Sequence, residues 1–232
     1  IYSVPLDVSV RYIILFTIFG AFLEKSGCAS FFLDFARGIS GRTGGPARTV
    51  TVISMMLGMI SGAPVTVVMV TAPMVLPLML KFGYSKDKAG GLLAAAGTGA
   101  YCMPPVLGSA AFIIAEVLRI PYLKVVVMSL FPAFLFFASI FVISYFEARK
   151  AIAMGTGGGY FEAKIDWRRI VLRTYFFLPL VVIVILLVIG FTPASAVIWS
   201  TGLTFVLSLF SRETRMGIKA VWGALEKGAK DL

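Results

Sequence analysis

The sequence predicts an all-α, polytopic membrane protein. Hydrophobic residues make up 59% of its 232 residues, charged residues only 14%, and the mean hydropathy is +0.96. Soluble domains contain roughly 45–50% apolar and about 25% charged residues. The charged residues also cluster between apolar blocks, several of which approach the ~20 residues that a helix needs to cross a bilayer. We therefore interpret residues 1–232 as one membrane domain.

The order of apolar and polar segments predicts the individual elements. The first apolar run ends at Glu24, and an amphipathic, then glycine-rich segment follows it. We expect residues 1–49 to form a scaffold, with one crossing helix and a short helix at the membrane interface. Residues 119–232 are expected to be connecting spans, at 125–145, at 174–191 and after a "TPAS" turn, followed by a basic cytoplasmic tail.

Lysine and arginine residues predict the orientation. The net charge is +10, but no basic stretch is interleaved with the stacking aromatics that nucleic-acid binding uses. The gaps at 25–48, 81–88 and 149–173 are rich in Lys and Arg, whereas the "TPAS" turn has none. If the basic gaps are cytoplasmic, as the positive-inside rule requires, the chain starts outside the cell and ends in the cytoplasm.

Residues 50–80 do not fit this alternation, because they have basic gaps on both sides. A single helix of this length would be about 46 Å long, too long for a hydrocarbon core of about 30 Å. The segment "SGAP" at 61–64 lies inside the block and interrupts it. We therefore expect a re-entrant hairpin that enters and leaves from the cytoplasm, with its tip near the middle of the membrane.

A second interruption, "GTGAYCMPPVLG" at 97–108, breaks the following apolar block. Irregular backbone at membrane depth is tolerated only where protein or a water-filled cavity covers it, so the two interruptions of 50–118 are expected to face each other. Freed carbonyls and hydroxyls at such a break can coordinate a hard cation, and helix N-termini favour an anionic group. The predicted cation and substrate site consists of Ser61, Gly62, Ala63, Pro64, Thr66, Thr98, Gly99, Met103, Pro104 and Pro105, with Ser61, Gly62, Thr98 and Gly99 as Na⁺ ligands.

Other interpretations of these features are open. A lone "SGAP" is also typical of close helix packing, and a single proline of a helix kink. Glu116 is either a coupling group or an interfacial acid that pairs with Arg119. Tyr122, Trp167 and Trp222 are expected to be interfacial anchors.

No enzyme chemistry is expected. The chain has no His, and its cysteines, Cys28 and Cys102, lie in different segments, so neither a metal centre nor a disulfide is predicted. "GTGGGY" at 155–160 lacks the Lys-Ser/Thr ending of a phosphate loop. The alternatives to a transporter are a passive channel and a non-transporting membrane scaffold.

Several stretches together resemble a known family. They are "PLDVSVRYIILFTIFGAFLEKSG", "FFLDFARGISGRTGGPAR", "GMISGAPV", "MPPVLGSAAFIIAEVLRIPY" and "ALEKGAKDL". They are similar to the large, DctM-like permease domain of tripartite ATP-independent periplasmic (TRAP) transporters, and most similar to the type in which the small and large membrane subunits are fused. The similarity covers essentially the whole chain.

The resemblance implies a secondary transporter of the inner membrane that imports C4-dicarboxylate-like or related organic acids, with Na⁺ as the coupling ion and no other cofactor. A periplasmic binding protein would deliver the substrate, and a small membrane subunit or fused equivalent would be a partner. The family's large domain has two inverted repeats and is thought to work as an elevator. By this comparison the chain is an elevator-type half-domain, the first repeat of a longer protein, and alone should not transport.

Two departures from the family's pattern concern the hairpin tip. Family members usually carry Ser-Gly-Ser there, followed soon by an Asn. Here Ala63 stands in place of the second Ser, and "PVTVV" at 64–68 has no Asn. These departures weaken the expectation of side-chain contacts at the tip, and they are compatible with backbone coordination there.

Overall fold

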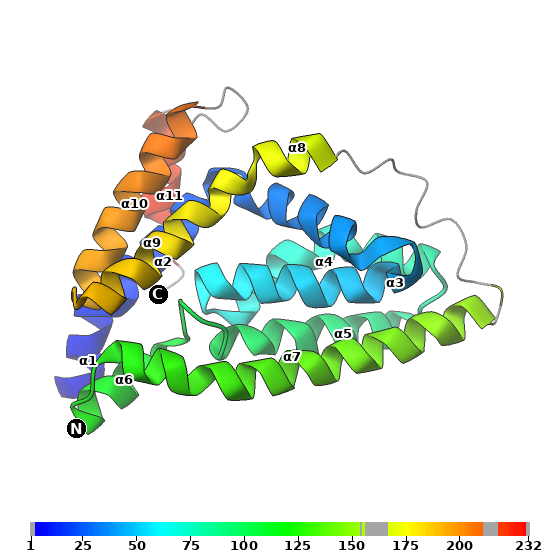
Figure 1. The fold of residues 1–232 in the computed structure, drawn as a ribbon, viewed down its shortest axis with the longest axis horizontal. Helices are drawn as coiled ribbons and strands as arrows, with labels where there is room; N and C mark the ends of the chain where they lie inside the picture. The colour runs from blue at the N-terminus through cyan, green and yellow to red at the C-terminus, as the bar shows by residue number, and fades with distance from the viewer. Residues whose placement is uncertain (1–2, 154, 156–166, 211–217, 231–232) are drawn as a thin grey trace.

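The computed structural model describes residues 3–153, 155, 167–210 and 218–230, and every element in these ranges is helical. The elements, seen in Figure 1, are α1 (Ser3–Val8), the π-helical η1 (Ser9–Ile13), α2 (Ile14–Lys25), α3 (Cys28–Ser61), α4 (Pro64–Lys81), α5 (Lys86–Thr98), the 3-10 helix η2 (Gly99–Tyr101), α6 (Ser109–Leu118), α7 (Tyr122–Ala153), α8 (Trp167–Leu172), the 3-10 helix η3 (Thr174–Phe177), α9 (Leu178–Ile189), α10 (Pro193–Phe210) and α11 (Ile218–Lys230).

Among the described residues, three helices are long and apolar enough to cross a membrane: Leu6–Lys25, Pro64–Lys81 and Tyr122–Ala153. Shorter apolar helices lie at Ser109–Leu118, Thr174–Ile189 and Pro193–Ser208. Figure 1 shows α5 and α7 running alongside the second part of α3, while α2, α9, α10 and α11 gather at the other end. This architecture confirms the predicted class of an all-α membrane protein.

Helix α3 folds back on itself, which the sequence analysis did not anticipate. As one straight helix its 34 residues would be about 51 Å long, yet Cys28 and Ser61 at its two ends line the same cavity. Gly45, inside α3, has a left-handed φ of 62° and is followed by Pro46. Figure 1 shows the reversal at the right-hand end of the molecule. The glycine-rich segment is therefore the bend of a folded helix, and the arm that leads to Ser61 starts near residue 46 instead of residue 50.

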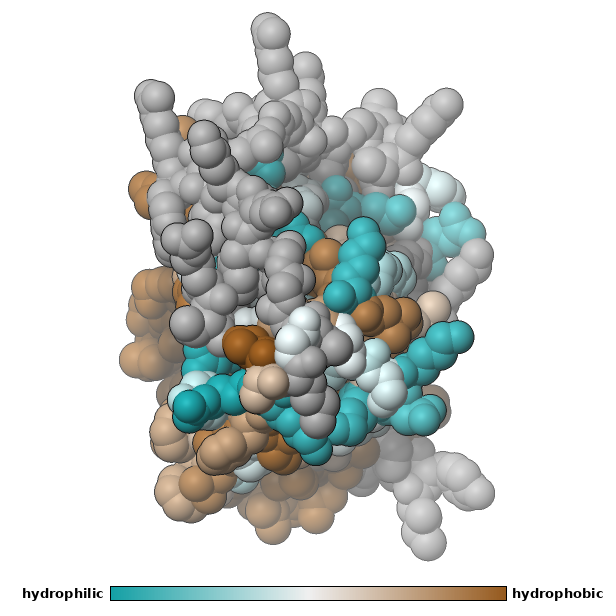
Figure 2. All heavy atoms as spheres, turned by 90° about the vertical axis from the view of Figure 1, so that its right-hand side faces the viewer, coloured by the Kyte–Doolittle hydropathy of each residue, from teal (hydrophilic) through white to brown (hydrophobic). Residues whose placement is uncertain are grey.

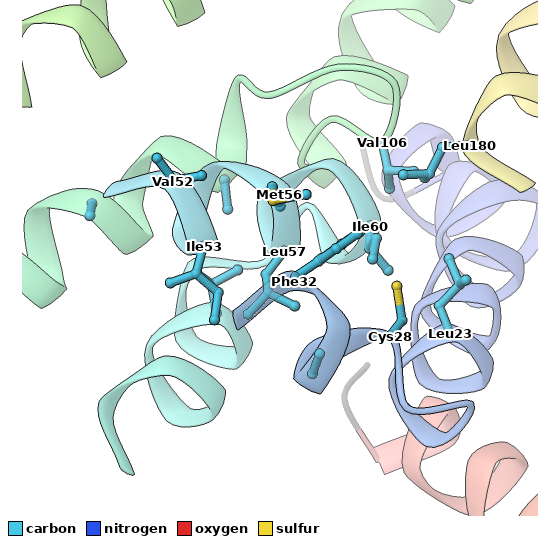
Figure 3. Close-up of a cluster of buried hydrophobic side chains, with 14 of the residues drawn as sticks. Leu23, Cys28, Phe32, Val52, Ile53, Met56, Leu57, Ile60, Val106 and Leu180 are labelled. Carbon is cyan, nitrogen blue, oxygen red and sulfur yellow. The ribbon is translucent and has the colours of Figure 1, made fainter. Parts of the chain in front are cut away.

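The segment expected to form a short interfacial helix is the first arm of the folded α3. Phe31 and Phe32 are almost completely buried, and their rings contact Phe176 and Phe177 at centroid distances of 5.5–5.7 Å. Figure 3 shows Phe32 facing Leu57 of the returning arm. The folded α3 thus encloses these aromatic side chains between helices, where burial of this size stabilises the fold more than exposure at the interface would.

The end of the chain has two further features that the sequence did not reveal. The "TPAS" segment is a helix start: Thr192 precedes α10, and its hydroxyl oxygen accepts a hydrogen bond of 3.3 Å from the Ser195 backbone N–H. The basic tail contains α11, which packs against α2, with Ala224 of α11 fully buried beside Ala21 and Phe22. Part of the tail is therefore docked on the scaffold helix.

Close backbone packing between α11 and α2 depends on Gly228. A Cβ atom at this position would lie 2.9 Å from Ile18 Cα and 3.2 Å from Ile18 N. We expect Gly228→Leu to detach α11 and to cost about 1–3 kcal/mol of stability, because a backbone neighbour cannot move aside. Limited proteolysis of α11 in the purified protein measures this. Gly223→Leu is the matched control, since nothing lies within 4 Å of a Cβ there, and equal sensitivity of both variants would contradict the packing.

Candidate functional site

The first interruption is the turn between α3 and α4. Gly62 has left-handed φ and ψ of 57° and 8°, Ala63 is extended, and Pro64 occupies the first turn of α4. The Ser61 hydroxyl accepts a hydrogen bond of 3.3 Å from Ala63 N–H and donates one of 3.2 Å to the Leu57 carbonyl. Ser61 therefore closes the turn, and its oxygen is engaged in local hydrogen bonds.

The second interruption separates α5 and η2 from α6. Residues 102–108 are not helical, and the Pro104–Pro105 peptide bond is cis. The Gly108 N–H donates to the Tyr101 carbonyl at 3.0 Å, which closes this segment into a compact loop. The two interruptions predicted from sequence are thus both present, the second at 102–108 and so in the later part of the predicted range 97–108.

The two interruptions touch each other through their backbones. A Cβ atom on Gly62 would lie 2.7 Å from the Leu107 carbonyl oxygen and 2.9 Å from that of Val106. A Cβ on Gly108 would in turn lie 3.3 Å from the Gly62 carbonyl oxygen. Three backbone carbonyl oxygens therefore gather where the turn meets the loop, and only glycine leaves room for this approach.

The small cavity beside the turn includes Ser61 and Thr66 among the predicted hydroxyl residues, but not Thr98. Ser61, Ala63 and Thr66 line a small cavity of about 40 Å³ that also contacts Thr17 and Glu24 on the scaffold helix. That volume is sufficient for a few water molecules. Thr98 is outside this lining, is exposed, and donates to the Ala94 carbonyl at 2.9 Å. The contact between the interruptions is therefore made by backbone atoms.

The remaining predicted residues have packing roles in the described structure. Gly99 is buried, and a Cβ there would lie 2.8 Å from the Phe136 ring. Met103 and Pro104 line an apolar groove against α7. The Pro105 carbonyl accepts a hydrogen bond from Tyr122, a residue that the sequence analysis placed elsewhere.

Tyr122 is not an interfacial anchor: only 5% of it is exposed. Its hydroxyl donates to the Pro105 carbonyl at 3.0 Å and accepts from the Leu107 N–H at 3.2 Å, and its ring stacks on Phe112 at 4.5 Å. Tyr122 therefore holds the loop segment that presents the Val106 and Leu107 carbonyls. In the sequence, "IPY" at the start of a span gave no indication that Tyr122 makes these hydrogen bonds to the loop.

The two tryptophans that were expected to be interfacial anchors can be compared with the structure only in part. Trp222 is 72% exposed, as an anchor would be, and the Trp167 side chain lies outside the described residues.

Glu116 is exposed, and among the described residues it forms no ion pair with Arg119. Arg119 instead ends α6 with a left-handed φ of 51°. The glycine-rich segment at 156–160 lies outside the described residues.

Helix ends surround the contact between the interruptions. The C-terminus of α3 is at Ser61 and that of α5 at Thr98, whereas α4 starts at Pro64 and α6 at Ser109. C-terminal ends carry partial negative charge and favour cations, and N-terminal ends favour anions. The arrangement thus combines carbonyl oxygens suited to a hard cation with positive helix ends suited to a carboxylate.

Nearly the whole chain matches one family of known proteins. The family model of the tripartite ATP-independent periplasmic transporter, DctM component, matches residues 2–231. A search among proteins of curated function found no match. Because the family match covers nearly every residue and its expected interruptions are present, the chain belongs to the DctM family of tripartite ATP-independent periplasmic transporters.

Proposed function

We propose that the chain is part of the permease of a cation-coupled secondary transporter that imports organic acids, C4-dicarboxylate-like or related. A periplasmic binding protein delivers the acid, and a small membrane subunit, separate or fused, completes the membrane component. The observation that carries this proposal is the backbone contact between Gly62 and the loop at Val106 and Leu107. Such a contact has no use in a simple membrane anchor, where unbroken helices satisfy the backbone at lower cost.

Na⁺ is the coupling ion of this proposal. It is bound by the carbonyl oxygens of Gly62, Val106 and Leu107, and Ser61 supports it by fixing the turn. Thr98 is exposed at the C-terminus of α5, and its hydroxyl contributes to binding the ion or the substrate. Oxygen ligands without a carboxylate suit a weakly held, exchangeable cation.

The substrate carboxylate lies near the N-termini of α4 and α6, where backbone N–H groups and the helix dipole favour an anion. The cytoplasmic side is the one that carries Lys81, Lys86 and Lys88, and the chain starts on the opposite side. With this orientation the turn at Gly62 lies about 24–27 Å along its two helical arms from the cytoplasmic ends, as a deeply inserted hairpin requires.

Uptake by the complete transporter in proteoliposomes tests the function. The experiment combines the full permease, its binding protein, labelled organic acids and an imposed Na⁺ gradient. We expect saturable uptake that stops when Na⁺ is removed. Ser61→Leu and Thr98→Val are expected to reduce it at least about tenfold, since each removes an oxygen at a helix end next to the contact.

Thr201→Val is the matched control, because Thr201 of α10 makes the same type of hydrogen bond, to the Val197 carbonyl at 2.8 Å, away from the interruptions. Uptake unchanged in both Ser61→Leu and Thr98→Val would show that these side chains have no role. A current or flux that does not saturate and ignores the Na⁺ gradient would identify a passive channel instead.

A further inference from the structure

An apolar groove of about 600 Å³ runs between α7 and the returning arm of α3. Along α7 its lining extends from Leu130 to Val142, about 18 Å at 1.5 Å per residue. This length is close to one leaflet of a bilayer whose hydrocarbon core is about 30 Å thick. The lining is apolar apart from Thr51, whose hydroxyl is bonded to the Ala47 carbonyl at 3.1 Å. The far wall includes Met103 and Pro104 of the interrupted helix.

Two guanidinium groups lie at the other end of this groove. The Arg48 guanidinium carbon is 4.8 Å from the ring centre of Phe141, which lines the groove, and 5.1 Å from that of Tyr145. Arg149 lies 5.7 Å from the same Tyr145 ring and contacts its hydroxyl at 3.5 Å. Both guanidinium carbons thus lie within the range of about 6 Å for a cation–π contact with one tyrosine ring.

These two positive charges have no carboxylate partner among the described residues. The ion pairs found there are Arg11 with Asp7, Arg37 with Asp34, and Lys88 with Glu147. The Arg48 Nε is buried and has no hydrogen-bond partner in the same part of the chain. A guanidinium group whose Nε is buried without an acceptor has lost part of its hydration, so an anion held near the group would stabilise its positive charge.

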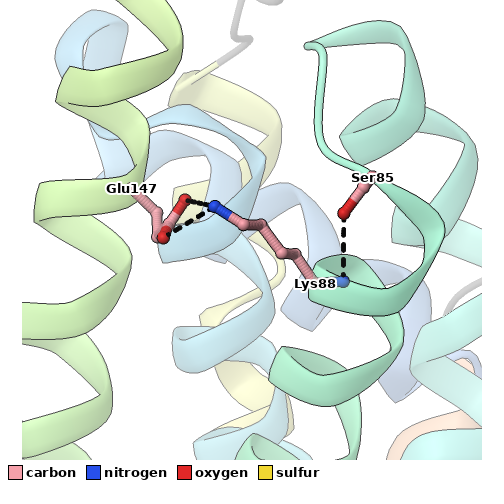
Figure 4. A network of polar contacts seen from close by, with 3 residues as sticks. All are labelled: Ser85, Lys88 and Glu147. Carbon is pink, nitrogen blue, oxygen red and sulfur yellow. Dashed lines mark hydrogen bonds and ion pairs between the residues drawn. The ribbon is translucent and has the colours of Figure 1, made fainter.

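Glu147, which precedes Arg149 on α7, is already neutralised by an ion pair. Figure 4 shows its carboxylate bound by Lys88, with Nζ–oxygen distances of 3.0 and 3.1 Å, while the Ser85 hydroxyl caps the Lys88 N–H. Burial and, second, the Glu147 carboxylate raise the pKa of Tyr84 to about 12, so that phenol is uncharged at neutral pH. Figure 2, which faces the end of the molecule where α3 turns, shows hydrophilic residues gathered next to hydrophobic surface, as at a membrane boundary.

We propose that this face binds an anionic phospholipid of the cytoplasmic leaflet, with its phosphate on Arg48 and Arg149 and one acyl chain in the groove. The positive charges of Arg48 and Arg149 favour a lipid with an acidic headgroup. The apolar groove, about as long as one leaflet is thick, favours a ligand with an acyl chain over free phosphate. Because the chain end reaches Met103 and Pro104, the lipid supports the interrupted helix from its lipid-facing side.

Lipid retention by the complete transporter tests this site. The purified protein is equilibrated with vesicles of phosphatidylcholine alone or mixed with phosphatidylglycerol, and bound lipids are quantified by mass spectrometry. We expect wild type to retain phosphatidylglycerol preferentially. Arg149→Gln, an exposed position, and Arg48→Gln should each weaken this about fivefold. Inorganic phosphate alone should not displace the lipid.

Two further variants separate the groove from the charges. Ala138→Trp fills the groove and should remove both lipids, whereas Ser139→Trp, exposed and outside the lining, should not. Lys124→Gln changes the same charge at the opposite end of α7 and should leave retention unchanged. Equal retention of both lipids in wild type and the arginine variants would overturn the proposal. So would an Ala138→Trp protein that keeps its lipids but loses a membrane subunit, because the groove would then bind a protein helix.

Discussion

Gly62→Ala is expected to weaken the Na⁺ dependence of uptake strongly while the protein still inserts into the membrane. A left-handed residue with a Cβ costs about 1–2 kcal/mol, and the new methyl group would lie 2.7 Å from the Leu107 carbonyl oxygen. Together with the displacement of the loop, the penalty is about 3 kcal/mol, or roughly a hundredfold in apparent Na⁺ affinity. Na⁺ titration of uptake in proteoliposomes measures the effect.

Substitutions at two other glycines distinguish the effect of backbone strain from the effect of the close contact with the loop. Gly190 also has a left-handed φ, of 102°, but nothing lies within 4 Å of a Cβ at that position, so Gly190→Ala tests the strain alone. Gly202→Ala introduces neither strain nor contact. If Gly190→Ala reduces Na⁺ affinity as strongly as Gly62→Ala, the contact between the interruptions is not the cause.

Tyr122→Phe is expected to raise the Na⁺ concentration for half-maximal uptake by on the order of tenfold. The substitution keeps the ring that stacks on Phe112 but leaves the buried Leu107 N–H without its acceptor, which costs about 1–3 kcal/mol. The loop that presents the Val106 and Leu107 carbonyls is then less well fixed before the ion binds. The maximal rate at saturating Na⁺ should change much less than the half-saturation value.

Tyr175→Phe is the matched control for this prediction. The Tyr175 hydroxyl is buried and has no hydrogen-bond partner among the described residues, so its removal should be neutral or slightly stabilising. If Tyr122→Phe changes thermal stability no more than Tyr175→Phe does and leaves the Na⁺ dependence of uptake unchanged, Tyr122 does not position the loop.

Hydrophobic composition and helix-breaking residues were sufficient to predict the fold class and both interruptions. "SGAP" and "MPPVLG" are local signals: glycine permits a left-handed turn, and proline cannot continue a hydrogen-bonded helix. Their mutual contact also followed, because exposed backbone is too costly in lipid. Local chemistry therefore determines where this chain stops being helical.

Long-range packing determined what the sequence did not reveal. "RTGGPA" indicated only a glycine-rich segment, whereas it is the bend of a folded helix whose first arm packs Phe31 and Phe32 against η3, far along the chain. The role of Tyr122 likewise depends on a loop that precedes it by more than a dozen positions. The approach of the Val106 and Leu107 carbonyls to Gly62 was overlooked because a backbone contact leaves no trace in side-chain identity.

Disulfide formation between positions 58 and 100 tests the contact of the two interrupted helices most directly. A Cβ on Gly58 would lie 3.3 Å from the Ala100 Cβ, slightly closer than the roughly 3.5–4.5 Å usual in disulfides, so a small separation of the two helices is sufficient for the bond. In the complete transporter, with Cys28 and Cys102 replaced by Ala, Gly58→Cys with Ala100→Cys should cross-link readily in membranes under mild oxidation. Gly58→Cys with Ala95→Cys, on the exposed face of α5, should not. A cross-link in the second pair and none in the first would contradict the account.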